Sequence, residues 1–326
     1  MNIVLFGCTE NTLHAAKYLS KLGLKIDLIT ITPNKAKTNK VVDYTDLTLW
    51  KELFSSIYVS ENFNLKAKFD IEYFKNLKSL KLGFCNGWQR LIPKEILDCF
   101  TVGVFGMHGS ARNLPFGKGH SPLNWALIEG RKRFHTNLFK CQSGIDDGPI
   151  IDTCVFSINS NDTIETLHYK NTLSMCYLIQ KNLKSLILGT NKVSAQSITS
   201  GESFYPKRAP ADGIIDWRDD VVNIDQLIRA VTYPFYGAFS FIKGAEIIII
   251  RSSIFYTDTE QHPFKSTSFG EILDIFPNNK FLVRCSGGVL IIHEYKGDIP
   301  SVGIKFDEHD GTLVRFKRNC FGFFDI

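Results

Sequence analysis

The stretch MNIVLFGCTENTLHAAKYLSKLGLKIDLITI (residues 1–31) decides the fold of this 326-residue chain. NIVLFGC (2–8) is a continuous apolar run typical of a buried parallel strand, and KIDLITI (25–31) supplies the next strand. Leucines and alanines recur at helical spacing between them, so the stretch predicts a βαβ unit. The turn GCTENT (7–12) is neither a GxGxxG nor a Walker loop, which argues against a dinucleotide-binding or P-loop protein.

The same alternation of strands and helices continues to residue 189. Further strands are predicted at SLKLGFC (79–85), TVGVFGMH (101–108), RFHTNLFKCQ (133–142) and GPIIDTCVFSI (148–158). Helices are predicted around 68–78, after Pro93, and over 122–130 and 162–189. The polar, Lys-rich segment 33–48 is interpreted as a surface loop at the carboxyl end of the second strand, where open α/β sheets bind ligands. Residues 1–189 therefore predict a Rossmann-like, mostly parallel sheet with flanking helices.

The composition of the sequence changes after residue 189. Residues 190–205 are rich in Ser and Thr and are interpreted as a linker. A helix over 223–231 follows, and then five short β-rich runs: GAFSFI, EIIIIRSSIFY, GEILDIF, FLVRCS and GVLIIHEY. Turns containing Gly or Asn-Asn separate these runs, which favours a small β-barrel, OB-like, over residues 206–326. The fold class is thus α/β with a small C-terminal β-barrel domain.

Composition narrows the class of protein. Lys and Arg number 38 and Asp and Glu 33, a net charge of +5 that suits an anionic small molecule and is too weak to indicate nucleic-acid binding. The eight cysteines are dispersed, without zinc spacing, so we expect free thiols in a reducing cytoplasm and no metal. The N-terminus lacks the pattern of a signal peptide, and no apolar run approaches the ~20 residues of a membrane span. We expect a cytoplasmic protein.

One pattern of residues suggests chemistry. His108 ends a predicted buried strand at the carboxyl edge of the sheet, and Asp146 and Asp147 follow in the Gly-flanked turn SGIDDG (143–148). An imidazole there can act as a general base or an electrostatic stabiliser, and a carboxylate can orient it. The spacing alone also fits a structural histidine and an ordinary hairpin turn. No GxSxG motif competes with it, and Cys85 lacks the electropositive surroundings of a reactive thiolate.

A resemblance to a known family strengthens the catalytic interpretation. GMHGSARNLPFGKGHSPLNWALIEGRKRFHTNLFKCQSGIDDGPII (106–151) resembles the catalytic segment of the formyltransferases that use N10-formyltetrahydrofolate. GWQRLIP (87–93) is similar to their folate-binding loop. SFYPKRAPADGIIDW (203–217) resembles the linker that opens the C-terminal barrel in methionyl-tRNA formyltransferase and in sugar-modifying members. The similarity covers most of the chain in the family's order.

The resemblance assigns roles to individual residues. His108 and Asp146 match the catalytic histidine and aspartate, whereas Asp147 takes no role. Gly106 stands where the family has an asparagine that helps to polarise the formyl carbonyl; Ser110, Asn86 and Asn124 are candidates to supply another donor. Contacts to the folate donor are expected from two loops: Gly87, Trp88, Gln89, Ile92, Pro93, Gly144 and Ile145. Contacts to the acceptor are expected from Tyr44, Lys118 and His120, although Tyr44 also fits a tyrosine at the edge of the core.

The function that the resemblance implies is formyl transfer from N10-formyltetrahydrofolate to the amine of a nucleotide-linked amino sugar, in surface-glycan biosynthesis. GMHGS followed by LPFGKGHSPLNW (114–125) is similar to a subgroup linked to pseudaminic-type pathways, in which the glycine at 106 is normal. Three alternatives remain: a methionyl-tRNA formyltransferase, a non-catalytic binding protein for folate or a nucleotide sugar, and a formyltetrahydrofolate hydrolase. The segment NKVVDYTDL (39–47) resembles sugar formyltransferases and argues against the first. The partners expected are two small molecules, with nucleic acid unlikely and no membrane, and a homodimer is left open.

Overall fold

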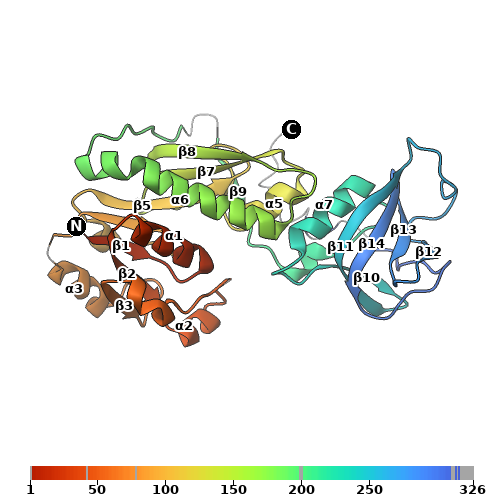
Figure 1. Cartoon of the computed structure of the whole chain (residues 1–326), viewed down its shortest axis with the longest axis horizontal. Helices are drawn as coiled ribbons and strands as arrows, with labels where there is room; N and C mark the ends of the chain where they lie inside the picture. Colours follow the sequence, from red (N-terminus) through yellow and green to blue (C-terminus); the bar gives the residue numbers. More distant parts are fainter. Residues whose placement is uncertain are drawn as a thin grey trace. The chain divides into compact units, whose positions relative to one another are not determined.

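Period-two alternation along β1 (Asn2–Phe6) places apolar side chains on both faces of a central sheet. Our computed structural model describes residues 2–41, 43–77, 79–197, 201–309, 313 and 315. Ile3 and Leu5 are buried in one core together with residues of α1 (Glu10–Lys21) and α6 (Ile164–Leu188), which Figure 1 shows on the same face of the sheet. The predicted buried strand is therefore confirmed.

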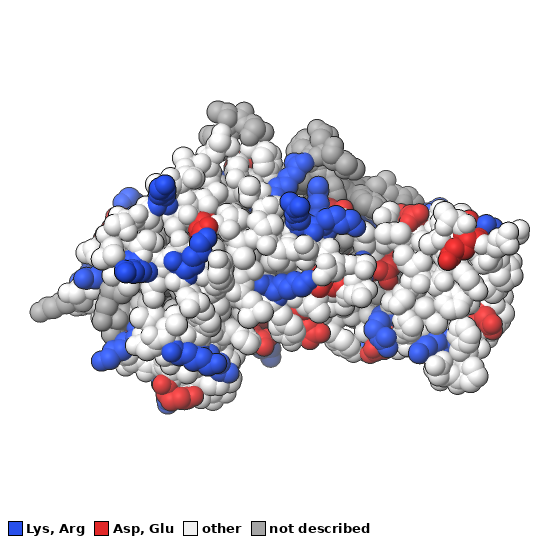
Figure 2. Space-filling view, turned by 45° about the horizontal axis from the view of Figure 1, so that its top comes forward, with Lys and Arg blue, Asp and Glu red and all other residues white. Residues whose placement is uncertain are grey.

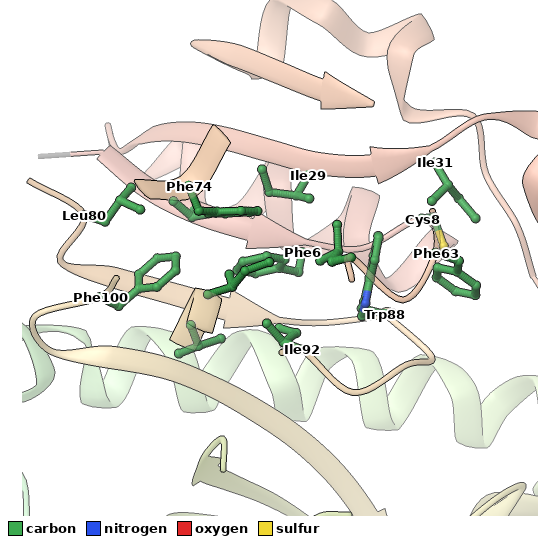
Figure 3. Packing of buried hydrophobic residues seen from close by; sticks show 14 of the residues in the cluster. Phe6, Cys8, Ile29, Ile31, Phe63, Phe74, Leu80, Trp88, Ile92 and Phe100 are labelled. Carbon is green, nitrogen blue, oxygen red and sulfur yellow. The ribbon is translucent and has the colours of Figure 1, made fainter. Parts of the chain in front are cut away.

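The opposite face of the sheet has its own core. Val4 and Phe6 pack there against Phe74 of α3 (Lys68–Asn76) and Ile96 of α4 (Lys94–Leu97). Figure 3 shows Phe6 at the centre of this aromatic group, between Phe74 and Trp88. The ring centroids of Phe6 and Phe74 lie 5.6 Å apart in a stacked arrangement. Both faces of the strand are thus covered, as a parallel sheet requires.

The sheet has seven strands in the order β3-β2-β1-β4-β5-β7-β8. The remaining strands are β2 (Lys25–Ile31), β3 (Ser56–Ser60), β4 (Leu82–Cys85), β5 (Gly103–Ser110), β7 (Arg133–Lys140) and β8 (Ile150–Ser157). Strands β1 to β5 pair in parallel, and β7 pairs antiparallel to β5 with His108 opposite Asn137. The predicted Rossmann-like, mostly parallel sheet is confirmed.

Two elements differ from the sequence-based expectation. The segment 33–48, predicted to be a loop, begins with α2 (Pro33–Thr38), which Thr32 caps by accepting a hydrogen bond from the amide of Lys35. A Thr-Pro pair is an N-terminal helix signal that the Lys-rich composition concealed. The segment then runs into a 3₁₀ helix over Leu47–Leu53. Strand β3 was not predicted, because its residues are half-buried at the edge of the sheet and form no apolar run.

The chain divides into two compact units. The first comprises residues up to 118, 135–156 and 170–202; the second comprises 119–134, 157–169 and residues from 203 onward. The second unit thus includes α5 (Pro122–Ile128), which lies within the stretch that the sequence analysis assigned to the N-terminal domain. It packs on α7 (Val221–Val231), where Asn124 Nδ2 donates to the carbonyl of Ala230 over 2.7 Å.

The five β-rich runs of the second unit form an antiparallel sheet in the order β10-β11-β14-β13-β12. These strands are β10 (Ala238–Ile242), β11 (Ala245–Thr257), β12 (Ile272–Ile275), β13 (Phe281–Cys285) and β14 (Gly288–Lys296). The segment 303–307 bridges the two edge strands: the amide of Ile272 donates to Ile304 O over 2.8 Å, and the amide of Asp307 donates to Phe241 O over 2.7 Å. This bridge gives the sheet the barrel-like closure that was predicted. The short strands β6 (Lys118–Gly119) and β9 (Phe204–Tyr205) form a separate pair.

The charged side chains are dispersed over the surface. On the face in Figure 2, Lys and Arg lie among neutral side chains with Asp and Glu between them, and one denser basic group stands near the middle of the view. Within the described ranges, every helix is too short or too polar to cross a membrane. The same residues hold no cluster of three or more His, Cys, Asp or Glu suited to a metal ion.

Candidate active site

The carboxyl ends of β1, β4 and β5 meet at one edge of the sheet. Ligands of open α/β sheets bind at such an edge. The loop Asn86–Trp88 follows β4, and its Asn86 is tied to the end of β1 because its amide donates to Phe6 O over 3.0 Å. His108 lies near the end of the neighbouring β5, with 9% of its surface exposed. The site is built around this histidine.

Asp146 approaches His108 from the turn between β7 and β8. Its Oδ2 lies 3.3 Å from His108 Nδ1. The backbone at Asp146 has φ +48°, a left-handed conformation that Asp tolerates better than most residues. Gln196 secures the turn, since its Nε2 donates to Asp146 O over 2.6 Å and to Gly148 O over 2.8 Å. Gly148 is required there because a Cβ would collide with the carbonyl of Lys140.

Both partners of the His108 ring are hydrogen-bond acceptors. Nε2 lies 2.8 Å from the carbonyl oxygen of Gly117, and Nδ1 faces the Asp146 carboxylate. A neutral imidazole has one N–H and one lone pair and can satisfy only one of them, whereas an imidazolium donates to both. An imidazolium at His108 would therefore donate to both the Gly117 carbonyl and the Asp146 carboxylate. Such a group suits the stabilisation of an oxyanion.

Ser110 stabilises the loop that holds His108. Its hydroxyl donates to Phe116 O over 2.5 Å and accepts from the amide of Arg112 over 3.2 Å. These bonds fix residues 111–117, whose Gly117 carbonyl contacts the imidazole. The Ser110 donor is thus engaged within its own loop, and the residue positions His108 through that loop.

Three cysteines lie in or next to the strands of this sheet: Cys8 after β1, Cys85 in β4 and Cys141 after β7. Burial raises the pKa of Cys8 and of Cys85 to about 12, and at Cys85 the charge of Asp146 adds to the effect. Burial also raises the pKa of the Cys141 thiol well above its usual value, and the Cys85 thiol, Asp146 and Asp147 contribute in the same direction. All three are therefore protonated at neutral pH, so none is a thiolate nucleophile.

Gly106 lies two residues before His108 and leaves space on the same face of β5. A Cβ on Gly106 would stand 2.9 Å from Phe139 Cζ and 3.0 Å from Cys141 Sγ. Phe139 lies opposite Gly106 in the β5–β7 register, and Cys141 follows two residues later. The side chains of this neighbouring strand thus occupy the place that a residue larger than glycine would need.

We expect Gly106→Asn to be no faster than the wild type and to lower the melting temperature. Phe139 and Cys141 must both shift to admit the amide, and overpacking of this kind costs about 1–3 kcal/mol. Steady-state kinetics and thermal unfolding measure the two effects. Gly23→Asn is the matched control, because Gly23 has φ +75° with no atom within 4 Å, and Asn tolerates that conformation. A Gly106→Asn variant with raised turnover would contradict the expectation. It would indicate that the glycine at 106 lowers the activity of the wild type.

The residues expected to contact the folate donor fall into two groups. Trp88 and Ile92 are buried in the core on the α3 face, where Trp88 packs edge-on against Phe63 with ring centroids 4.9 Å apart (Figure 3). Pro93 is the N-cap of α4, as the sequence predicted for a helix opened by proline. The others lie at or near the surface: Gly87, Gln89, Gly144 and the half-exposed Ile145.

The candidate donors and acceptor contacts are placed as follows. Asn86 is buried, and its Nδ2 donates to Asn11 O over 3.4 Å. Tyr44 is half-buried against the core, and its hydroxyl donates to Ile31 O over 3.2 Å. Lys118 is buried with its ammonium 2.9 Å from a Glu202 carboxylate oxygen, and its positive charge is therefore already paired. Asn124 and the exposed His120 belong to the second unit.

Three residues in or near this site were not predicted from the sequence. Gly117 and Gln196 act through a backbone carbonyl and through a side chain in the predicted linker, and neither leaves a signal in the sequence. Cys141 stood within the quoted segment 106–151 as one of eight dispersed cysteines. Its relation to Gly106 depends on the β5–β7 register, which the order of residues does not reveal.

A His–Asp pair at the carboxyl edge of a Rossmann-like sheet, joined to a unit with a five-stranded antiparallel sheet, defines a two-unit α/β protein with acid–base groups at its sheet edge. The chain belongs to the formyl transferase family: residues 1–174 match the family "Formyl transferase", and residues 207–298 match "Formyl transferase, C-terminal domain". The resemblance found in the sequence is confirmed.

A curated relative is similar in sequence to most of this chain. The bifunctional polymyxin resistance protein ArnA of Wigglesworthia glossinidia brevipalpis is 31% identical over 266 residues, which are 78% of this chain. The match covers 38% of ArnA, so the chain spans about two fifths of the length of that relative.

Two solved structures share the fold. An N-formyltransferase of Helicobacter canadensis, in complex with folinic acid and dTDP-3-aminofucose, has a TM-score of 0.63 at 20% identity, over 90% of this chain and 99% of the other. WlaRD, a sugar 3N-formyltransferase solved in the presence of dTDP and 5-N-formyl-THF, has a TM-score of 0.63 at 19% identity, over 91% and 98%. At these identities the likeness concerns the fold alone.

Proposed function

We propose that this protein is an N-formyltransferase that moves a formyl group from N10-formyltetrahydrofolate to the amine of a nucleotide-linked amino sugar. The observation that carries the proposal is the contact of 3.3 Å between His108 Nδ1 and Asp146 Oδ2 at the ligand-binding edge of the sheet, in a chain of the formyl transferase family. The family defines the group that is transferred. The pair supplies the charge and the proton acceptor that the transfer needs.

The loop after β4 fits a folate donor. Asn86 Oδ1 and Trp88 Nε1 are buried, and the described residues give neither atom a hydrogen-bond partner. A buried polar atom without a partner carries a free-energy cost, which a ligand able to donate and accept would remove. A pterin ring has both kinds of group, so this loop would hold it and bring an activated formyl group to the site. Among known structures, the Helicobacter canadensis enzyme binds folinic acid.

His108 and Asp146 have different roles in the proposed reaction. Attack by an amine on a formyl carbon makes the amine lose a proton and gives the formyl oxygen negative charge. Asp146, whose side chain is 22% exposed, accepts that proton directly or through water. His108, placed between two acceptors, would as an imidazolium offer positive charge to the oxygen. The C–N bond to the acceptor forms as the bond to the donor nitrogen breaks, and the proton passes to the leaving nitrogen.

The proposed acceptor class rests on the segment around Tyr44. The amide of Thr45 donates to Cys8 O over 3.0 Å, and the carbonyl of Asp43 accepts from the amide of Glu10 over 3.3 Å. The segment is thus anchored to the turn after β1, at the same edge of the sheet as His108. The Helicobacter canadensis enzyme is complexed with dTDP-3-aminofucose, which makes nucleotide-linked amino sugars the first acceptors to test. We place the product in surface-glycan biosynthesis.

A panel assay tests the function. The purified protein is incubated with N10-formyltetrahydrofolate and a set of nucleotide-linked amino sugars that differ in nucleotide and amine position, and mass spectrometry detects the added formyl group. We expect one acceptor class to be formylated at an enzymatic rate. One parallel reaction contains methionyl-tRNA as the acceptor, and another contains no acceptor. Transfer to methionyl-tRNA alone would replace the proposal with the tRNA activity, free formate without transfer would indicate a hydrolase, and donor binding without reaction would indicate a non-catalytic relative.

A further inference from the structure

Strand β5 extends beyond its neighbour β4 at the point where it carries His108. The β4–β5 register ends at Cys85 and Gly106. The β5–β7 register continues to Ser110 and pairs His108 with Asn137. Residues directly opposite each other in an antiparallel pair have their side chains on the same face, with Cβ atoms about 4.5–5.5 Å apart. Within the described strands, the backbone that carries the imidazole is therefore paired with β7 alone, and Asn137 is its direct neighbour.

The side-chain amide of Asn137 binds the backbone of His108. Its Nδ2 donates to His108 O and to His135 O, each over 3.3 Å. Its Oδ1 accepts from the hydroxyl of Thr153 in β8 over 2.9 Å. If the amide oxygen and nitrogen were exchanged, the oxygen would face two carbonyl oxygens, so the three partners fix the orientation of the amide. Asn137 thus joins the backbone of His108 to the edge strand β8.

Helix α6 holds Thr153 in place through the preceding residue. Asp152 Oδ2 accepts from Asn182 Nδ2 over 2.9 Å and lies 2.8 Å from Lys181 Nζ, and both partners belong to α6. Successive residues of a strand point to opposite faces of the sheet, so Asp152 faces α6 while Thr153 faces Asn137. A continuous set of polar contacts therefore runs from α6 through β8 and β7 to His108.

We propose that Asn137 is a positioning residue, whose bond to His108 O sets where the imidazole lies between its two partners. The inference rests on the formyl transfer proposed above. The ring meets Asp146 Oδ2 at 3.3 Å and Gly117 O at 2.8 Å, and a displacement of about 1 Å at a catalytic group can cost about 10²-fold in rate. Asn137 is fully buried, so it acts through His108 and does not touch a ligand.

Three variants test the effect on rate. Asn137→Ala removes the amide and leaves a cavity, whereas Thr153→Val keeps the shape of the side chain and removes only the hydroxyl that orients Asn137. We expect kcat to fall about tenfold in Asn137→Ala and about threefold in Thr153→Val, with KM for the donor changed less than about twofold. Thr153→Ser retains the hydroxyl and is expected to restore the wild-type kcat. Wild-type kcat in folded Thr153→Val and Asn137→Ala would overturn the inference.

A matched variant on the other face of β7 separates positioning from stability. Thr136 is fully buried, and its hydroxyl donates to Asn171 Oδ1 on α6 over 2.7 Å. Thr136→Val therefore removes a comparable hydrogen bond next to Asn137 without touching His108. We expect both Thr→Val variants to lower the melting temperature by similar amounts, and only Thr153→Val to lower kcat. An equal loss of kcat in the two variants would overturn the positioning role, because the rate would then follow stability.

An NMR measurement on His108 is independent of turnover. The imidazole signals of His108 are assigned by their loss in His108→Ala and are recorded at one fixed pH for the wild type and the variants. We expect these signals to shift in Thr153→Val and to stay in place in Thr136→Val. Unshifted signals in folded Thr153→Val and Asn137→Ala would overturn the inference even if formyl transfer is established. Shifted signals in a protein that formylates no acceptor would refute the proposed function and support the positioning of His108 by Asn137.

Discussion

His108→Ala is expected to lower kcat for formyl transfer by about 10²–10³, the range found when one oxyanion donor is removed. The ring contacts both the Asp146 carboxylate and the Gly117 carbonyl. Its loss removes the ring that would stabilise the oxyanion and leaves Asp146 without its contact to the imidazole. KM for the donor is expected to change much less, since the imidazole acts on charge that develops during the reaction.

The folded state must be measured alongside the rate. Removing the imidazole removes its hydrogen bond to the Gly117 carbonyl, which costs about 0.5–1.5 kcal/mol and lowers the melting temperature. Circular dichroism and thermal unfolding therefore accompany the kinetics. His14→Ala is the control, because His14 lies on α1 with its side chain half-exposed beside Glu10. Near-wild-type turnover by folded His108→Ala protein would refute the assigned chemistry.

The parts of the fold that the sequence predicted are those with strong local patterns. NIVLFGC is apolar at every position that the sheet buries, so β1 was predictable without knowledge of its neighbours. Strand β3 pairs with a neighbouring strand on one side only, and its mixed pattern resembles a loop. Helix α2 is six residues long and has only Ala36 buried, too little to produce a helical period. Prediction therefore failed where an element depends on its neighbours more than on its own residues.

The candidate site shows the same division. His108 and the DDG turn were found because a strand end and a Gly-flanked turn have local signatures, and the family resemblance then placed them together. The approach of Cys141 to Gly106 depends on the pairing of β5 with β7, two strands that are distant in the sequence, which no local pattern encodes. Asn124 was a candidate donor in the sequence, and in the structure its amide donates to Ala230 O of α7. Hydrogen-bond partners distant in sequence decide which polar residues remain available to a ligand.

Asp146→Asn is expected to be as damaging as the histidine change, whereas Asp147→Asn is expected to stay within a few-fold of the wild type. The two carboxylates are adjacent but face different surroundings: Asp146 Oδ2 contacts His108, while the exposed Asp147 lies over Gly144. Asn keeps the size of Asp and tolerates the left-handed backbone at 146, so the substitution removes charge and proton acceptance without strain. General base catalysis contributes about 10²–10⁴ to a rate, which sets the expected loss.

The comparison of these two variants separates a catalytic pair from a mere turn. Each is purified, its melting temperature is measured, and kcat and KM are determined with the acceptor found in the panel assay. Equal small effects at both positions would show that the turn serves structure alone and that the contact between Asp146 and His108 carries no chemistry. Sensitivity at Asp147 with tolerance at Asp146 would shift the catalytic role by one residue. Because Gln196 holds the backbone of the turn through Asp146 O and Gly148 O, and not through either carboxylate, both variants keep the turn's anchoring and the difference between them reports on the carboxylates.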